Sequence, residues 1–274
     1  MTPRLCRGAL ALSFVVGVCA QPPAPTYIPQ TKFASGQDVQ PVFEGWLRNT
    51  DGTFTMVFGY FNRNWKEELA IPAGPDNKLE PGDPDRGQPT YFLPRRQQFI
   101  FRVQVPADWG QKELVWSISA HGKTEKAYAQ LLPVEEVSER MIMTRGGLNP
   151  GEDDPNKPPL ITIAPLGTAS VRSPLPLAAM VTDDGLPKPR PAPKPRAGAQ
   201  SNTVVNRPRG LNVSWFEYKG PAKVIFDPAG LIMVADGKAV TTARLAEPGI
   251  YVLRATANDG ALSTIADVTI TVSR

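Results

Sequence analysis

The segment PGIYVLRATANDG, residues 248–260, decides the fold expected for the C-terminal part of this 274-residue chain. It opens on a Pro-Gly turn, continues through residues of high β propensity and closes on Asn-Asp-Gly. Short strands of the same kind surround it, separated by Gly, Pro and Asp about every 8–12 residues, which is typical of a β-sandwich. They are MVTDDGLP (180–187), LNVSW (211–215), GPAKVIF (220–226) and VTITV (268–272). The pattern predicts an immunoglobulin-like sandwich over residues 158–274.

These spaced motifs resemble the polycystic-kidney-disease-type (PKD-like) immunoglobulin domain, in which the same pieces occur in the same order. The resemblance covers residues 158–274, apart from an insertion at 187–210. It implies an immunoglobulin-like fold and an extracytoplasmic setting. Domains of this family serve mostly as spacers, adhesion modules or accessory parts of exported proteins, so the resemblance implies no catalytic activity.

Two aromatic residues support this fold independently. Trp215 lies on an alternating strand, and we expect it to fill the core between two sheets. Tyr251 follows Pro248-Gly249 at a strand entry, which predicts a tyrosine corner whose hydroxyl bonds to backbone upstream. The alternative for each is an exposed side chain that binds a ligand.

Residues 39–136 predict a second sandwich. Hairpins are expected at Asn49-Thr50-Asp51-Gly52 and at His121-Gly122-Lys123. This half also resembles uncharacterised exported bacterial proteins, which implies no function. Period-2 alternation predicts two sets of residues that each share a strand face: Phe54, Met56, Phe58 and Tyr60, and Phe99, Phe101, Val103 and Val105.

Three other segments are expected between or within the strands. Residues 72–89 are rich in Gly, Pro and Asp and are interpreted as a long loop. Residues 134–143 are the best candidate for a helix, and residues 137–157 are interpreted as the linker between the two domains.

The first twenty residues predict a signal peptide. Arg4 and Arg7 precede a short apolar stretch, and Val18-Cys19-Ala20 offers small residues for cleavage. Residues 21–38 then form a polar tether. A lipoprotein acylated at Cys19 is the alternative, which Val18 disfavours. No later apolar run reaches the length of a membrane-spanning helix.

Cleavage after Ala20 would remove both cysteines, Cys6 and Cys19. The mature chain could then form no disulfide, and export without disulfides suits a periplasmic or extracellular bacterial protein. Loss of Arg4 and Arg7 from the 30 basic residues leaves 28 against 26 acidic ones. Because this balance is nearly neutral, it gives no support to nucleic-acid binding.

The insertion at 187–210 alternates proline with basic residues. It is expected to form an extended, polyproline-like loop, because proline removes the donors that a sheet needs. One interpretation is a solvated loop between two strands, and the other is a basic arm that contacts an anionic surface. Its basic residues are Lys188, Arg190, Lys194, Arg196, Arg207 and Arg209.

The chain offers little equipment for catalysis, so we expect no enzyme and no cofactor. His121 is the single histidine, which excludes the two-histidine zinc motifs, and no Gly-x-Ser-x-Gly elbow accompanies it. Asp183, Asp184 and Asp259 could supply oxygen ligands to calcium. Asp-Gly turn chemistry explains them equally well, so no metal site is assigned.

A cluster of aromatic and basic residues is the best candidate for ligand contact. Both faces of the strand near residue 60 carry aromatics, whereas a sandwich buries one face. We therefore expect some of these side chains to be exposed. The candidates are Phe61, Arg63 and Trp65, joined by Arg95 and Arg96 if the fold brings that later segment close.

The sequence as a whole predicts an all-β protein: two immunoglobulin-like β-sandwich domains in tandem after a signal peptide. The expected function is a non-catalytic exported structural or binding module of the bacterial envelope. Its expected partner is an envelope protein or polysaccharide. The alternative is a carbohydrate-binding accessory protein or a carbohydrate-active enzyme.

Overall fold

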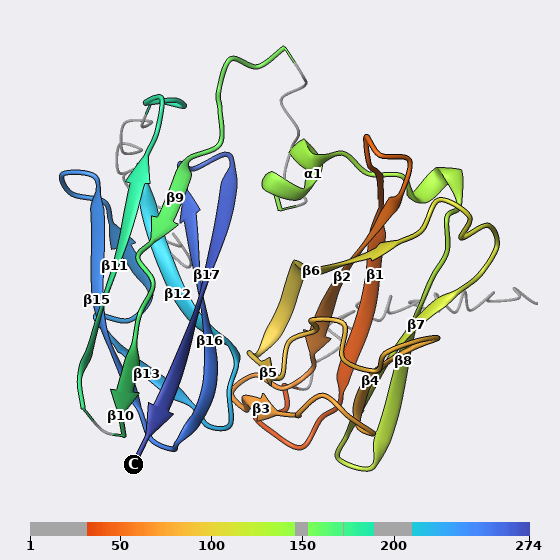
Figure 1. The fold of residues 1–274 in the computed structure, drawn as a ribbon, viewed down its shortest axis with the longest axis horizontal. Helices are drawn as coiled ribbons and strands as arrows, with labels where there is room; N and C mark the ends of the chain where they lie inside the picture. The colour runs from red at the N-terminus through yellow and green to blue at the C-terminus, as the bar shows by residue number, and fades with distance from the viewer. Residues whose placement is uncertain (1–31, 146–152, 172, 189–209) are drawn as a thin grey trace, which may run out of the picture. The chain divides into compact units, whose positions relative to one another are not determined.

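The structure is a computed structural model that describes residues 32–145, 153–171, 173–188 and 210–274. Residues 32–274 form one compact unit. Strands make up almost all of its regular structure (Figure 1), so the all-β prediction is confirmed. The expected signal peptide, and the expected tether up to residue 31, lie outside the described residues. In the part of the chain that is described, no helix is long and apolar enough to cross a membrane.

The N-terminal half contains three small sheets. Their strand orders are β1-β2-β6, β4-β7-β8 and β3-β5. The strands are β1 (Val39–Arg48), β2 (Phe54–Asn62), β3 (Leu69–Ala70), β4 (Asn77–Glu80), β5 (Tyr91–Phe92), β6 (Arg95–Val105), β7 (Leu114–Ala120) and β8 (Lys123–Ala129).

The core of this half lies between β1-β2-β6 and β4-β7-β8. Phe58 of β2 stacks on Phe101 of β6 at 5.1 Å between ring centroids, and Trp116 of β7 meets Phe101 edge-on at 4.7 Å. Both hairpins form where they are predicted. In the second, His121 and Gly122 have φ angles of 50° and 76°, as a tight turn between twisted strands requires.

The C-terminal half consists of two facing sheets. Their strand orders are β13-β15-β11-β9 and β10-β17-β16-β12-β14. The strands are β9 (Leu160–Ile163), β10 (Thr168–Ser170), β11 (Leu175–Thr182), β12 (Asn212–Lys219), β13 (Val224–Asp227), β14 (Leu231–Met233), β15 (Lys238–Leu245), β16 (Gly249–Asn258) and β17 (Ser263–Ser273).

This arrangement is an immunoglobulin-like sandwich. Trp215 and Tyr251 are buried between its sheets, as predicted. The Tyr251 hydroxyl donates to the Glu247 carbonyl at 3.0 Å, which is the predicted tyrosine corner. β10 pairs with β17 in parallel, whereas the other pairs within the two sheets are antiparallel.

The prediction that Phe99 shares a face with Phe101, Val103 and Val105 is wrong. Phe99 has a φ of 53° and packs against a separate cluster of Leu47, Val57 and Ile142. The cause is a register shift where β6 passes Gly59 of β2. A Cβ at Gly59 would collide with the Gln97 carbonyl, so only glycine allows this close approach.

The helix predicted over 134–143 is interrupted. A 3₁₀ turn, η1 (Pro133–Glu135), and a short helix, α1 (Glu139–Met143), replace it. Between them the Val137 amide donates to the Trp46 carbonyl at 2.9 Å, so this part of the chain is extended along β1. Ser138 then starts α1, because its hydroxyl accepts the Met141 amide at 3.2 Å.

Two other segments are more ordered than the sequence indicated. The expected loop 72–89 contains β4, which pairs with β7. Residues 32–38, the end of the expected tether, are bonded to the chain after β2. There the Gln37 amide donates to Asn64 Oδ1 at 2.7 Å, and the Trp65 amide donates to the Phe33 carbonyl at 2.9 Å.

Candidate functional site

Three of the five predicted contact residues meet on the surface of the N-terminal half. Phe61 is near the end of β2, Trp65 follows in the next turn, and Arg95 opens β6 opposite Asn62. The Arg95 guanidinium carbon lies 4.6 Å from the Phe61 ring centroid and 4.3 Å from that of Trp65. The Lys32 ammonium lies 4.4 Å from the same Trp65 centroid. We call Phe61, Trp65, Arg95 and Lys32 the aromatic–cation cluster.

The backbone holds Arg95 in place for this contact. Its φ is 68°, a left-handed conformation that non-glycine residues adopt at a cost of about 1–3 kcal/mol. Its Nη1 donates to the Arg63 carbonyl at 3.1 Å, which fixes the side chain over the two rings. Trp65 remains 42% exposed, so the cluster is open to a ligand from solvent.

The other two predicted residues point into different contacts. Arg63 Nη2 donates to Gln40 Oε1 at 2.7 Å, and its Nη1 lies 3.5 Å from Asp38. Arg96 Nη2 forms an ion pair with Glu44 at 2.7 Å. Arg63 and Arg96 therefore stabilise the fold beside the aromatic–cation cluster and are not part of it.

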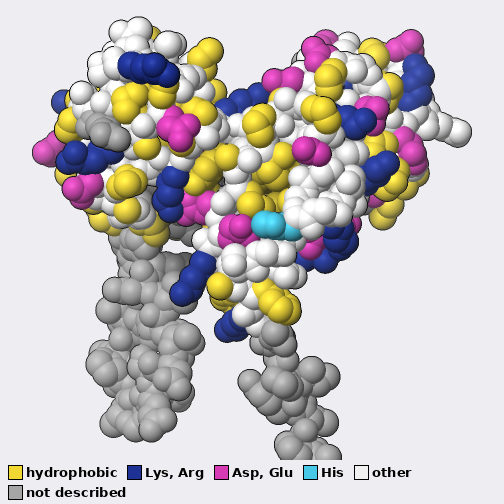
Figure 2. Space-filling model, turned by 90° about the horizontal axis from the view of Figure 1, so that it is seen from below, with side chains coloured by type: hydrophobic (Ala, Val, Ile, Leu, Met, Phe, Trp, Pro, Cys, Tyr) yellow, Lys and Arg dark blue, Asp and Glu magenta, His cyan; other side chains and the backbone are white. Residues whose placement is uncertain are grey.

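Charges around Asp38 compensate one another. Burial acts to raise the pKa of Asp38, but hydrogen bonding to Lys123 and the charge of Arg63 outweigh it and hold this pKa below its usual range. Nearby, His121 Nε2 lies 3.1 Å from Glu67 Oε2. Basic and acidic side chains also alternate over the face drawn in Figure 2. The described surface there shows no extended area of one sign.

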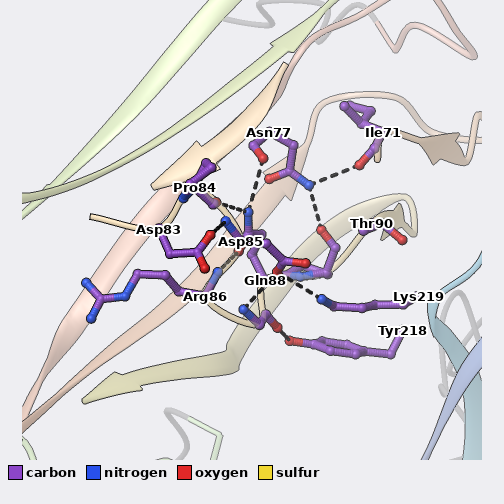
Figure 3. A network of polar contacts seen from close by, with 12 residues as sticks. Ile71, Asn77, Asp83, Pro84, Asp85, Arg86, Gln88, Thr90, Tyr218 and Lys219 are labelled. Atoms are coloured by element: carbon purple, nitrogen blue, oxygen red, sulfur yellow. Dashed lines mark hydrogen bonds and ion pairs between the residues drawn. The ribbon is translucent and has the colours of Figure 1, made fainter. Parts of the chain in front are cut away.

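A second polar network, shown in Figure 3, joins the two halves. Asn77 is fully buried, and its Nδ2 donates to the carbonyls of Ile71 and Pro89 at 3.0 and 2.8 Å. Gln88, also fully buried, donates to the Asn77 carbonyl at 3.0 Å. These two amides give the loop before β5 a fixed shape.

That loop is in turn bonded to β12. The Tyr218 hydroxyl donates to the Gly87 carbonyl, and Lys219 Nζ lies 3.1 Å from Asp85 Oδ1. The Thr90 amide donates to the Tyr218 carbonyl at 3.1 Å. The Tyr218 side chain is 5% exposed and belongs to the core of the N-terminal half. We call this set of contacts the junction.

A buried cation completes the junction. Arg254 of β16 forms a bidentate pair with Asp267, both distances being 2.7 Å, and also donates to the Ile100 carbonyl. Its guanidinium carbon lies 3.8 Å from the Tyr218 ring centroid. The charge is thus paired and hydrogen-bonded, as burial of a guanidinium requires.

The junction was not predicted, although the sequence of β12 contains a signal for it. β12 reads Trp-Phe-Glu-Tyr over 215–218, which places large aromatics on both of its faces. Trp215 fills the sandwich core, so Phe216 and Tyr218 project outward. An outward face with two aromatics indicates that another layer covers the sheet.

The three loop aspartates are used in turns. Asp183 accepts the Gly185 amide at 3.0 Å, Asp184 accepts those of Leu186 and Lys157 at 2.9 Å, and Asp259 accepts that of Leu262 at 2.7 Å. Turn chemistry therefore accounts for these side chains. Among the described residues, no group of three or more His, Cys, Asp or Glu is arranged to hold a metal ion.

The predicted basic arm falls almost entirely outside the described residues. Lys188 is described and exposed. The basic-arm hypothesis stays a prediction for the remaining residues, which are Arg190, Lys194, Arg196, Arg207 and Arg209.

Comparison with known proteins yields fold similarity only. No protein-family model matches the chain, and no curated protein matches its sequence. A conjugative transposon lipoprotein from Bacteroides eggerthii DSM 20697 is 11% identical, with a TM-score of 0.28, over 41% of this chain and 96% of that one. A chimeric titin Z1Z2 protein is 18% identical, with a TM-score of 0.25, over 43% of this chain and 96% of the titin chain. Domains 4 and 5 of the S-layer protein SbsC are 12% identical, with a TM-score of 0.25, over 60% of this chain and 66% of the SbsC chain.

These structural similarities are too distant to transfer a function. The class of the protein follows from its own strand order and tyrosine corner: it is an immunoglobulin-like β-sandwich protein.

Proposed function

We propose that this chain is a non-catalytic, exported structural or binding module of the bacterial envelope, in which both halves act as one stiff unit. The observation that carries the proposal is the junction. Contacts between domains of one chain usually permit relative motion, unless the interface is large and apolar. Here Tyr218 of one half is buried in the core of the other, which disfavours such motion.

A stiff unit suits a protein that spaces or presents other surfaces. Bending at the junction would expose Tyr218 and would separate the buried Arg254 from the Ile100 carbonyl. Arg254 would keep its pair with Asp267, but loss of a hydrogen bond from a charged donor costs about 1.5–3 kcal/mol. Within the proposal, the C-terminal half is a PKD-like domain, an assignment supported by its sequence motifs and its tyrosine corner.

The stiffness of the unit can be tested by scanning calorimetry. We expect the chain to unfold in one transition, because neither half can lose its structure without exposing Tyr218. Tyr218→Ala is expected to remove this coupling and to split the transition in two, with at least one component at lower temperature. Tyr128→Ala on β8 is the control, since Tyr128 is 56% exposed. Two separate transitions in the unsubstituted chain would contradict the proposal.

Export to the periplasm or beyond is supported by the basic and apolar N-terminal segment and by the position of both cysteines within it. When the chain is expressed in a bacterium, we expect the protein in the envelope or medium fraction. Mass spectrometry should find Gln21 as its first residue. A diacylated Cys19 peptide would support the lipoprotein alternative, and an uncleaved cytoplasmic protein would overturn the export proposal.

A carbohydrate-binding accessory role is a second candidate, favoured by the aromatic–cation cluster. Exposed tryptophan next to two cations suits a polysaccharide that carries carboxylate or sulfate groups. In affinity electrophoresis we expect an acidic polysaccharide such as alginate to retard the chain more than a neutral glucan does. Trp65→Ala should weaken the retardation by alginate, because it removes the ring on which the sugar packs, and Trp109→Phe, outside the cluster, should preserve it. Equal retardation of the parent chain and Trp65→Ala would exclude the cluster as the site.

A further inference from the structure

A cavity of about 330 Å³ lies between α1, β6 and the outward face of β16 and β17. Residues of both halves line it. Its walls are mostly apolar: Phe99, Ile142, Met143, Phe216 and Ile265. A water molecule takes up roughly 30 Å³ in the liquid, so this cavity has room for a ligand of about ten non-hydrogen atoms. Apolar cavities at the meeting of two domains are common positions for small ligands.

Three arginines line the same cavity, and two of them have acidic partners. Arg254 is paired with Asp267, as described above. Arg102 forms a bidentate pair with Glu139 of α1, with 2.7 Å between Nη2 and Oε2. Arg145, two residues after the end of α1, has no carboxylate within 4.0 Å among the described residues. The cavity therefore contains one positive charge more than its described acids neutralise.

Two polar groups that line the cavity, the Arg145 guanidinium and the Thr264 hydroxyl, have room for a further partner. Partial desolvation, together with the positive charge of Arg254, lowers the pKa of Arg145. A partly desolvated guanidinium beside a like charge is a favourable position for an anion. In addition, the Thr264 hydroxyl is buried without a hydrogen-bond partner. Buried polar groups normally have a partner, so both groups are complementary to a ligand that brings an acceptor.

We propose that this cavity binds a small amphipathic monoanion, in which a carboxylate faces Arg145 and Thr264 and an apolar chain fills the space beside α1. The apolar walls exclude a fully hydrated dianion, and the single uncompensated charge matches one carboxylate. Because the cavity is lined by both halves, the ligand would contact both and would increase the stability of the unit by mass action. This inference does not depend on the aromatic–cation cluster or on the envelope role.

The test uses the chain from Gln21 onward and three probes that share a chain length of eight carbons: octanoate, octanol and octylammonium. Binding is measured by calorimetric titration and by the shift in the melting temperature near pH 7.5, at which octanoate is ionised. We expect octanoate to bind at one site and to raise the melting temperature. Octanol should bind at least tenfold more weakly, because it provides no charge-assisted hydrogen bond, and octylammonium should not bind.

Two substitutions in the cavity and one outside it test whether octanoate binds in this cavity. Arg145→Gln should weaken octanoate binding by about tenfold or more and leave octanol binding unchanged. Ile142→Trp should fill the cavity and abolish binding of both probes. Arg244→Gln, which removes an exposed arginine of β15, should have no effect.

Three results would overturn the proposal. One is no detectable octanoate binding, and another is equal affinity for octanoate and octanol, which would indicate a purely apolar cavity. The third is octanoate binding that Arg145→Gln leaves unchanged, which would place the site elsewhere. Arg145 is not among the buried residues of the core, so Arg145→Gln is expected to fold, and this result does not depend on whether Ile142→Trp folds.

Discussion

Trp116→Ala is expected to lower the free energy of unfolding by about 5 kcal/mol, near the upper end for a buried tryptophan. Trp116 is fully buried, and it contacts Phe58, Phe92 and Phe101. Its indole N–H donates to Asn77 Oδ1 at 2.9 Å. The substitution would therefore create a cavity and also leave a buried amide oxygen without its donor, which adds about 1–3 kcal/mol.

Phenylalanine substitutions separate these two contributions. Trp116→Phe retains most of the apolar contact but removes the donor to Asn77, so we expect a loss of about 2–3 kcal/mol. Trp215→Phe is the matched control, because the indole N–H of Trp215 is buried without a partner. It should cost less than Trp116→Phe. Urea denaturation of the variants measures both, and equal losses would show that the bond to Asn77 contributes nothing.

The sequence is sufficient to predict the position of a side chain where the alternation along its strand agrees with the packing of the neighbouring strands. Trp215 and Tyr251 lie on strands with clear alternation, and both occupy the predicted positions. Phe99 was misplaced because its face depends on a bulge, and that bulge arises from the close approach of β6 to Gly59. Alternation along one strand carries no information about a register shift against its neighbour.

For the aromatic–cation cluster, too, alternation along one strand indicates which residues lie at the surface but not which residues they contact. Period-2 alternation indicates that some aromatics near residue 60 are exposed; Trp65 is exposed and Phe61 is partly buried. It could not assign partners to individual arginines, because Arg95 and Arg96 are adjacent in sequence but make different contacts. The junction was missed because its buried amides, Asn77 and Gln88, lie in a segment whose composition is that of a loop.

Substitution of Glu217 is expected to have the second large effect on the free energy of unfolding, and this effect depends on pH. Its side chain is 2% exposed, one oxygen accepts the Val224 amide at 3.0 Å, and the other has no partner. Burial, with a smaller contribution from the charge of Glu68, raises the pKa of Glu217 to about 8. The carboxyl is therefore neutral in the folded protein at neutral pH, whereas in the unfolded chain it ionises near its usual value of about 4.3.

The sign of the effect follows from proton binding. Between about pH 4.3 and 8 the folded state retains a proton that the unfolded state has lost, so this group reduces stability as the pH rises. The reduction is complete above the folded pKa. The difference between the folded pKa of about 8 and the unfolded value of about 4.3 corresponds to about 4–5 kcal/mol. Glu217→Gln keeps the shape and the hydrogen bond but cannot ionise, so it escapes this loss.

We therefore expect Glu217→Gln to match the parent chain within about 1 kcal/mol near pH 4.5 and to exceed its stability by about 4–5 kcal/mol near pH 9. Urea denaturation of both proteins at several pH values gives the difference, in which the contributions of all other titrating groups cancel. Glu80→Gln is the control for the loss of a carboxylate at the surface, because the Glu80 side chain is 56% exposed and pairs only with Lys78 among the described residues; its difference from the parent should stay within about 1 kcal/mol. A Glu217→Gln difference that stays constant from acid to alkaline pH would show that Glu217 ionises normally in the folded protein. A lower stability of Glu217→Gln near pH 9 would show that the ionised carboxylate has a partner that stabilises it.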